Sequence, residues 1–444
     1  MTMTLSQLQD KVQSQKTLIP SLYGDVDFSI IPERFATEPD AETSLVGKAG
    51  KKYRPQILAD KENVEKMLAY TMLGDTVADA YAALLPEYGL QKLIAMLKKA
   101  CDEGVDAVEN APQELKNFIA AMETMPDWVD MDLVEAGARY SRIQMATVVP
   151  FAIRGAFVAT FMNKYSGLPM AMTGSLTDER ASIQRVNETA SFFTTATLPR
   201  ALKRDGVGFK AAAMVRLMHS MVRFNILKRS DKWDIPTYGI PIPQVDQMPA
   251  GTIPSFLTAF RVVASGRKEF NHRERAIVEL CRYQSYLLGL PEDLLPATPE
   301  GIVNVTMTYA GTLRDGYEDA TCGELTRATM GAYRPKDKKF LSRVHNAVEK
   351  SFSKVFFEQA FTRGNPKPIA KIMGVQSTPR DYALAALAFA WVGPQFLGHA
   401  IAMFIPGLNK ISDRMLIHRI NKLLVEYGHA EYTTDADKYK PAVA

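Results

Sequence analysis

Apolar residues in this chain recur mostly at three- and four-residue spacing, and this spacing limits the possible folds more than any other feature. The pattern begins at Lys61, and it covers residues 114–125, 132–161, 275–288, 339–360, 379–404 and 409–427. Such spacing places apolar side chains on one face of an α-helix, whereas the alternation typical of strands is nearly absent. No strand–helix–strand rhythm and no internal repeat appears. We therefore expect an all-α, multi-helix bundle.

Proline sets the expected boundaries of these helices. Residues 17–56 contain Pro20, Pro32, Pro39 and Pro55 with little periodicity, which predicts an irregular N-terminal arm over residues 1–60. We expect a single helical domain over residues 61–435 and a tail over residues 436–444.

Two further prolines and one proline-rich segment bear on individual helices. Pro150 should break the long pattern of residues 132–161, and Thr298 should cap a helix with Pro299 at its first position. Residues 234–254 hold five prolines and two glycines, so we expect no helix there.

The charges and cysteines exclude several classes of protein. The net charge is only +4, with Lys/Arg and Asp/Glu interspersed, so we expect no nucleic-acid partner. The three cysteines, Cys101, Cys281 and Cys322, are scattered and contain no Cys-x-x-Cys pair. They indicate no disulfide framework and fit a reducing compartment. Residues 1–16 are polar and show no secretory signal, so a cytoplasmic location is expected.

One segment is apolar enough to enter or contact a membrane. Residues 382–409 contain no Asp, Glu, Lys or Arg, but Gly393-Pro394 and Pro406 should interrupt a single spanning helix. We expect a broken helical hairpin that is buried or contacts a membrane surface peripherally, rather than a span.

Common catalytic and cofactor motifs are missing. The chain has neither a complete Gly-x-Gly-x-x-Gly fingerprint nor a P-loop, and Glu426-x-x-His429 is a lone Glu-x-x-His. It has only six histidines and no His-x-x-x-His pair, so a metal site with several histidines is not expected.

Residues 209–227 form the segment that points most directly to a site. Apolar residues surround nearly every face of this expected helix, which predicts that it is buried. Arg216, His219 and Arg223 nevertheless fall on one stripe. Buried guanidiniums need an anion or another acceptor. A haem supplies one, because its propionates bind arginine and its iron binds a neutral imidazole. The alternative is a core histidine with two arginines bridging to carboxylates on other helices.

A second polar stripe lies upstream, in residues 178–199. Arg185, Glu188, Thr189 and Phe192 share one helix face, which could form the polar roof of a reactive pocket. The alternative is an ordinary intrahelical pair of Arg185 with Glu188 or Thr189 on a solvated face.

These segments resemble the rubber-oxygenase family, which includes the latex-clearing proteins and the MpaB-type oxygenase of mycophenolic acid synthesis. The matching pieces, in matching order, are RVNET (185–189), VRLMHSMVR (215–223) and WDIPTYGIPIPQVD (233–246), with Thr252 and Phe256 behind them. The similarity is clear over residues 128–296 and weaker on both sides.

The resemblance implies an all-α, globin-like bundle that binds haem b. His219 would be the proximal iron ligand, and Arg216 and Arg223 would lie around that ligand and the haem edge. Arg185, Glu188 and Thr189 would lie on the distal side, where family members activate dioxygen and cleave the carbon–carbon double bonds of isoprenoids.

The chain departs from the rubber-cleaving members in ways that affect the expected chemistry. Those members carry a lysine at the position of Glu188 and a distal glutamate further upstream, whereas residues 136–177 contain no acid. Pro243 replaces their usual asparagine. With no secretion signal either, rubber itself is a poor expected substrate.

The expected function is therefore a haem b-dependent oxygenase that uses dioxygen on an apolar, alkene or isoprenoid-like small molecule. The rival interpretations are a haem carrier or sensor and a peroxidase-like or dehydratase enzyme on the same scaffold. Any membrane role is expected to be peripheral, through residues 382–409.

Overall fold

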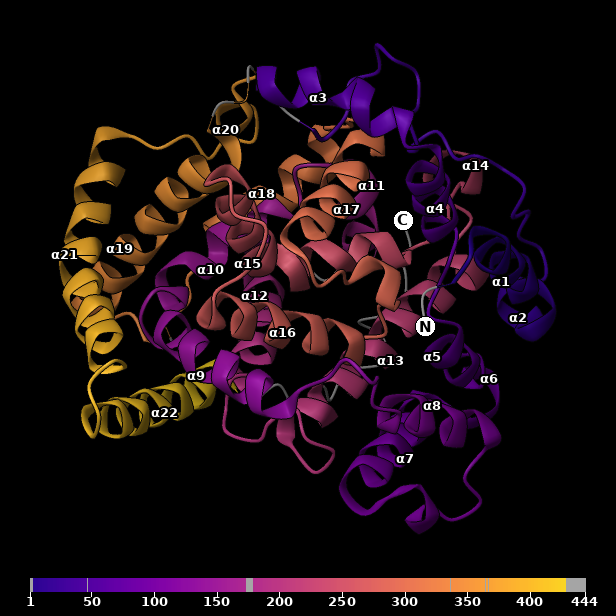
Figure 1. The fold of residues 1–444 in the computed structure, drawn as a ribbon, viewed down its shortest axis with the longest axis horizontal. Helices are drawn as coiled ribbons and strands as arrows, with labels where there is room; N and C mark the ends of the chain where they lie inside the picture. Colours follow the sequence, from indigo (N-terminus) through magenta and orange to yellow (C-terminus); the bar gives the residue numbers. More distant parts are fainter. Residues whose placement is uncertain are drawn as a thin grey trace. The chain divides into compact units, whose positions relative to one another are not determined.

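The protein is all-helical across the part of the chain that the structure describes (Figure 1). This computed structural model describes residues 3–45, 47–172, 179–335, 337–363, 365 and 367–428. Extended pairing within these residues is limited to two isolated bridges, Phe35 with Leu313 and Thr43 with Arg314. The all-α prediction is confirmed.

The chain forms two compact units, and each is described by itself. The first comprises Met1–Gly137 and Arg200–Asp315, and the second comprises Ala138–Pro199 and Gly316–Glu431. The single domain expected over residues 61–435 stays a prediction. The expected tail over residues 436–444 lies outside the described residues.

The first unit contains these helices: α1 (Leu5–Leu18), α2 (Pro20–Tyr23), α3 (Gly47–Ala59), α4 (Lys61–Thr71), α5 (Thr76–Ala82), α6 (Leu85–Tyr88), α7 (Leu90–Glu103), α8 (Gln113–Glu123), α13 (Val207–Arg229), α14 (Ile235–Tyr238), α15 (Gln244–Ala264), α16 (His272–Leu287) and α17 (Pro299–Thr312), with short 3₁₀ turns at Val105–Ala107 and Glu292–Leu294. Helix α13 packs against α5, α7 and α16, so most of its side chains are buried. Burial on all sides is what its all-round apolar sequence predicts.

The second unit contains most of α9 (Met131–Thr147) and these further helices: α10 (Val149–Ala159), α11 (Lys164–Met172), α12 (Glu179–Thr195), α18 (Glu324–Gly331), α19 (Phe340–Phe357), α20 (Ile369–Ile372), α21 (Pro379–Ala402) and α22 (Leu408–Tyr427), with π-helical turns at Asp319–Gly323 and Glu358–Thr362. Helix α19 packs between α10 and α21, and α12 packs against α22 and α18. The core here includes Phe157, Phe161, Val186 and Phe357.

Several predicted helix boundaries are confirmed. Pro150 separates α9 from α10, because a proline is tolerated in the first turn of a helix but not in its middle. The Thr298 hydroxyl accepts a hydrogen bond from the Gly301 backbone N–H at 3.1 Å, with Pro299 as the first residue of α17.

The prediction of an irregular N-terminal arm is wrong where residues 1–60 form helices. Helix α1 begins with a capping box at Thr4, and α2 begins at Pro20. Helix α3 continues through Pro55. Proline is compatible with a helix start, and packing outweighs its local cost inside α3.

The prediction of no helix in residues 234–254 is also wrong. Helix α14 occupies Ile235–Tyr238, and α15 begins at Gln244 and contains Pro249 and Pro254. Each internal proline removes one backbone hydrogen bond, but α15 packs against α16 and α17. Tertiary packing, and not the local sequence, therefore determines that this segment is helical.

The expected break at Gly393-Pro394 is likewise wrong, because α21 is continuous through both residues. Pro394 and Ala390 are exposed, so solvent can satisfy the carbonyl group that the proline leaves without an N–H partner. The helix ends at Ala402 instead, and the chain turns at Gly407, where φ is 86°. Within the described residues, α21 is the helix that is long and apolar enough to cross a membrane by length and composition.

Candidate functional site

His219 is a half-buried histidine in the middle of α13, in the first unit. Its Nδ1 lies 3.1 Å from Oε1 of Gln247, which α15 supplies. A carbonyl oxygen can only accept a hydrogen bond, so Nδ1 donates in this contact, and a neutral ring would carry its lone pair on Nε2. Histidines that ligate a metal usually have this arrangement, in which a partner of the other nitrogen fixes the tautomer and the ring.

Arg216 lies one turn before His219 and pairs with Asp75 at the start of α5. Its Nε and one terminal nitrogen donate to the two carboxylate oxygens at 2.7 and 2.8 Å. The guanidinium outweighs the effect of burial and lowers the pKa of Asp75. Gly289 lies against this pair with a φ of 91°, and a Cβ there would come within 2.5 Å of an Asp75 oxygen. Only glycine lets the chain pass so close.

Arg223 lies one turn after His219 and is fully buried. It donates to Asp79, to the carbonyl of Pro241 at 2.9 Å and to the carbonyl of Ile242. Asp79 also accepts from the Tyr23 hydroxyl at 2.6 Å. Burial disfavours the charged guanidinium, but the Asp79 carboxylate outweighs it and raises the pKa of Arg223. Arg223 is therefore a cation that binds α5 and the loop before α15 together.

The segment that follows this loop places the side chain of Gln247 next to His219. Gln244 donates from its side chain to the carbonyl of Gly74 at 3.1 Å, and its backbone N–H donates to Leu73. Asp246 accepts from Arg34 at 2.9 Å and from the Tyr309 hydroxyl at 3.1 Å. These contacts fix the first turn of α15, where Gln247 faces the imidazole.

Ile242 has a backbone conformation that side chains rarely adopt, with φ at 48°. A β-branched residue is strained there. Its carbonyl accepts from Arg223, which holds the strained turn in place. Through this contact and its bond to Pro241, Arg223 joins α13 to residues 241–242 of the WDIPTYGIPIPQVD segment.

Arg185, Glu188 and Thr189 lie half-buried on α12, in the second unit. Arg185 pairs with Glu188 at 3.2 Å, and the Gln184 amide donates to the other Glu188 oxygen at 2.9 Å. The arginine and glutamate side chains are 12% and 11% exposed, so this intrahelical pair does not lie on a solvated face.

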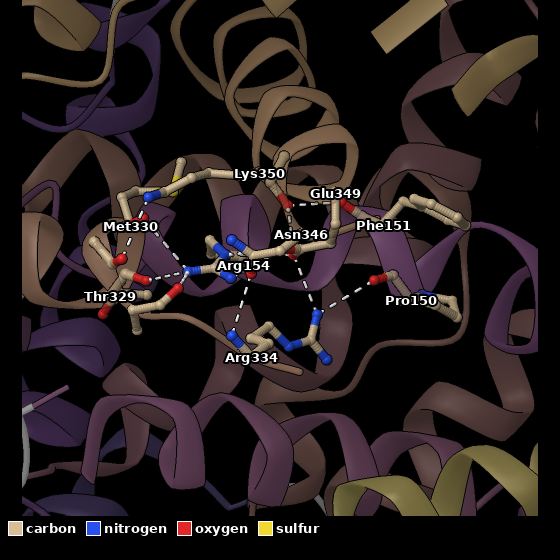
Figure 2. A network of polar contacts seen from close by, with 12 residues as sticks. Pro150, Phe151, Arg154, Thr329, Met330, Arg334, Asn346, Glu349 and Lys350 are labelled. Carbon is tan, nitrogen blue, oxygen red and sulfur yellow. Dashed lines mark hydrogen bonds and ion pairs between the residues drawn. The ribbon is translucent and has the colours of Figure 1, made fainter. Parts of the chain in front are cut away.

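A buried charge network centred on Arg154 and Glu349 (Figure 2) also contacts α12. Arg154 donates to Glu349 at 2.9 Å and to the carbonyl groups of Thr329 and Ala332 at 2.7 and 2.8 Å. Arg334 donates to Glu349 at 3.1 Å and to the side-chain oxygen of Asn187 on α12 at 3.3 Å. Asn187 lies between Arg185 and Glu188 in sequence, so this network fixes the turn of α12 that carries them.

The chain matches a known enzyme family over residues 107–393. This family is described as the catalytic domain of the ER-bound oxygenase mpaB/B' and rubber oxygenase. The chain belongs to this family. A solved structure of a latex clearing protein in its closed state has the same fold, with a TM-score of 0.55 and 17% identity over 80% of this chain and 91% of that one. No curated protein matches the chain.

Membership of this oxygenase family makes the chain an oxidoreductase, and the resemblance predicted from its motifs is confirmed. Arg216, His219 and Arg223 share one helix of the first unit, whereas Arg185, Glu188 and Thr189 share one helix of the second. The roles assigned to these six residues stay predictions. The two arginines of α13 pair with carboxylates on another helix, as the alternative interpretation expected.

Sequence reasoning missed three residues of this arrangement, which are Asp75, Asp79 and Gln247. Asp75 and Asp79 lie four residues apart, so they share a face of α5. This acidic pair was the available local signal, but the arginines lie seven residues apart, so the spacing does not identify them as partners. Gln247 lies just beyond the matching segment and gives no local signal.

The donor set at His219 can supply the one protein ligand that a haem requires. Among the described residues, no three His, Cys, Asp or Glu side chains gather closely enough to hold a bare metal ion. A haem needs only one imidazole from the protein, because the porphyrin supplies the other nitrogens. A half-buried imidazole with its Nδ1 proton held by Gln247 is suited to that single bond.

Proposed function

We propose that the chain is a haem b-dependent oxygenase that uses dioxygen to oxidise an apolar, alkene-containing or isoprenoid-like small molecule. Membership of the oxygenase family supports the reaction class. The observation that carries the haem proposal is the His219–Gln247 contact at 3.1 Å, within the family's Arg-x-x-His-x-x-x-Arg helix.

In this proposal His219 binds the iron through Nε2, and the haem supplies the activation of dioxygen. Gln247 would orient the imidazole by accepting a hydrogen bond from its Nδ1–H. Arg216 and Arg223 lie around this ligand and the haem edge. Their pairing with Asp75 and Asp79 makes them groups that hold α13 in place.

Glu188 is the proposed distal acid or base. It would hold a proton on a carboxylate oxygen, with Arg185 and Thr189 positioning that carboxylate. The glutamate replaces the lysine of rubber-cleaving members, so a different distal chemistry is expected.

The proposed location is cytoplasmic, with residues 382–409 in peripheral contact with a membrane surface. An apolar substrate partitions into membranes, so such contact would bring the enzyme to its substrate. The exposure of α21 supports this contact, because only 17% of its most apolar stretch is buried.

Oxygen consumption by the hemin-loaded chain with an isoprenoid alkene tests the catalytic part of the proposal. Glu188→Gln keeps the shape of the side chain and removes its charge. We expect unchanged haem content and oxygen-dependent turnover that is slower by about 10²–10⁴-fold. Glu324→Gln, on an exposed position of α18, is the matched control and should turn over at the wild-type rate.

Turnover of Glu188→Gln at the wild-type rate would show that Glu188 is not the catalytic group. A haem-loaded wild type that consumes no oxygen with any alkene would favour a carrier or sensor instead. Turnover that requires hydrogen peroxide in place of dioxygen would favour a peroxidase-like enzyme.

A further inference from the structure

Helix α21 is packed against the second unit along one narrow stripe only. Its buried positions are Asp381, Ala385, Ala388 and Val392, at the three- and four-residue spacing of a single helix face. The rest of its circumference, and the turn after it, carries apolar side chains that are between 52% and 72% exposed: Leu387, Phe389, Trp391, Leu397, Ile401 and Phe404. Contiguous exposure of this kind marks a site of interaction with a protein or a membrane.

The exposed apolar surface extends onto the start of α19. Lys354 contacts Asp381 at the start of α21, whereas Val348 packs against the cluster that contains Ala388 and Val392 further along, so the two helices run antiparallel. The first residues of α19 therefore lie toward the C-terminal half of α21. They include Phe340 and Leu341, which are 71% and 77% exposed.

The start of α22 extends the surface further. Leu408, Ile411 and Met415 are all exposed and follow directly from the turn after α21. In Figure 1, α19, α21 and α22 form one margin of the second unit. We call the exposed apolar residues of 340–344, 386–405 and 408–415 the apolar face.

Basic residues border the apolar face. Lys338, Lys339 and Arg343 are exposed at the start of α19, and Lys410 and Arg414 are exposed on α22. Two acids are close in sequence. Asp337 accepts hydrogen bonds from the Ser342 hydroxyl and the Lys339 N–H, and Asp413 pairs with Arg142. The border therefore carries an excess of positive charge.

We infer that the apolar face docks in the plane of a bilayer surface that carries anionic lipid headgroups. Exposed Trp and Phe side chains favour the boundary between headgroups and acyl chains, and Lys and Arg beside them favour lipid phosphates. The inference deepens the proposed membrane contact of residues 382–409, and it does not depend on haem binding.

The packing of α21 favours an in-plane arrangement over a span. Its 24 residues correspond to about 36 Å, enough to cross a hydrocarbon core of about 30 Å. However, α19 lies along α21 and carries Lys350 and Lys354, and Gln395 of α21 binds Arg419 of α22. A span would carry these charges into hydrocarbon, which is costly.

The test is co-sedimentation of the intact chain with vesicles of phosphatidylcholine alone or mixed with phosphatidylserine. We expect at least about tenfold stronger partition onto the mixed vesicles, decreasing with added salt, because each surface cation contributes about a fivefold gain. The fluorescence of Trp391 should shift to the blue on binding, and Trp391→Phe should remove that shift.

Matched variants separate the two components of the surface. Phe389→Ser with Trp391→Ser should weaken partition onto both vesicle types by about tenfold or more. Lys410→Gln with Arg414→Gln should remove most of the preference for phosphatidylserine. Ile31→Ser, at a residue that is 64% exposed in the first unit, is the control and should bind like the wild type.

Several results would overturn the inference. Equal binding to both vesicle types would remove the role of the basic border, and extraction from cell membranes only by detergent would show a span. Absence of vesicle binding, together with self-association that Phe389→Ser with Trp391→Ser abolishes, would assign the face to a second copy of the chain. A hemin titration of the same preparation tests haem binding independently of vesicle binding.

Discussion

Arg223 has no exposed surface, and its guanidinium binds Asp79 and two backbone carbonyl groups. Arg216 donates two hydrogen bonds to Asp75. Such pairs add little net stability compared with an apolar core, but each partner is costly to leave alone. The two ion pairs lie on either side of His219 along α13, so they fix the orientation of the helix that presents the imidazole.

Replacement of Arg223 should therefore destabilise the chain strongly. Arg223→Leu leaves Asp79 buried without its cation and frees the strained turn at Ile242. We expect the free energy of unfolding in urea to fall by about 3–5 kcal/mol. Arg343→Leu, at an exposed position on α19, should change it by less than about 0.5 kcal/mol. Equal losses from both variants would contradict this role of Arg223.

Gln247 should affect haem binding more than stability. Gln247→Leu removes the acceptor of the Nδ1 proton, so the ring loses its fixed tautomer and orientation. We expect hemin affinity to fall by about 10–100-fold in an optical titration. Gln247→Glu still provides an acceptor and should restore most of the affinity. Wild-type affinity in the leucine variant would show that the contact does not position the ligand.

At the scale of elements, α12 and α21 are each held by a carboxylate-centred network of the second unit. Glu349 of α19 binds Arg334, which reaches Asn187 of α12. Asp381 completes the capping box of α21 with Thr378 and also accepts from Ser351 at 2.8 Å. Burial raises the pKa of Asp381, but these hydrogen bonds and Lys354 outweigh it and lower the pKa from 3.8 to about 2.

The lowered pKa of Asp381 predicts a pH dependence of stability. Above pH about 4 the carboxylate is ionised in both states, and its contribution is fully present. As the pH falls toward about 2, the unfolded chain takes up the proton first, so this contribution is lost. Asp381→Asn should lower the unfolding free energy by about 1–2 kcal/mol near neutral pH, and the difference from wild type should shrink below pH about 4. A difference that stays constant with pH would contradict the assignment.

At the scale of the whole molecule, the spacing of apolar residues was enough to predict an all-α fold. Local capping signals also placed α17 and the α9–α10 break. The errors came where packing outweighs local preference, as at Pro249, Pro254 and Pro394 inside helices. They show that a proline count identifies a loop only when no neighbouring helix stabilises the segment.

The site was predictable only as far as its local patterns extend. The stripe of Arg216, His219 and Arg223 is visible in the sequence, but Asp75 and Asp79 lie 141 and 144 residues before their arginines. No spacing rule links positions that far apart. From the sequence alone, the partner of each arginine in α13 could therefore be a haem propionate or a carboxylate on another helix, and the fold was needed to choose between them.

The optical spectrum of the purified chain, as isolated and after addition of hemin and reduction, tests the central claim that His219 binds haem b. The account predicts a Soret band and a pyridine haemochrome of haem b. His219→Ala should lose most of the bound haem and keep its helical circular dichroism, whereas His418→Ala, at an exposed position on α22, should keep both. A wild-type chain that is colourless and takes up no hemin, or a His219→Ala variant that binds hemin like the wild type, would contradict the account.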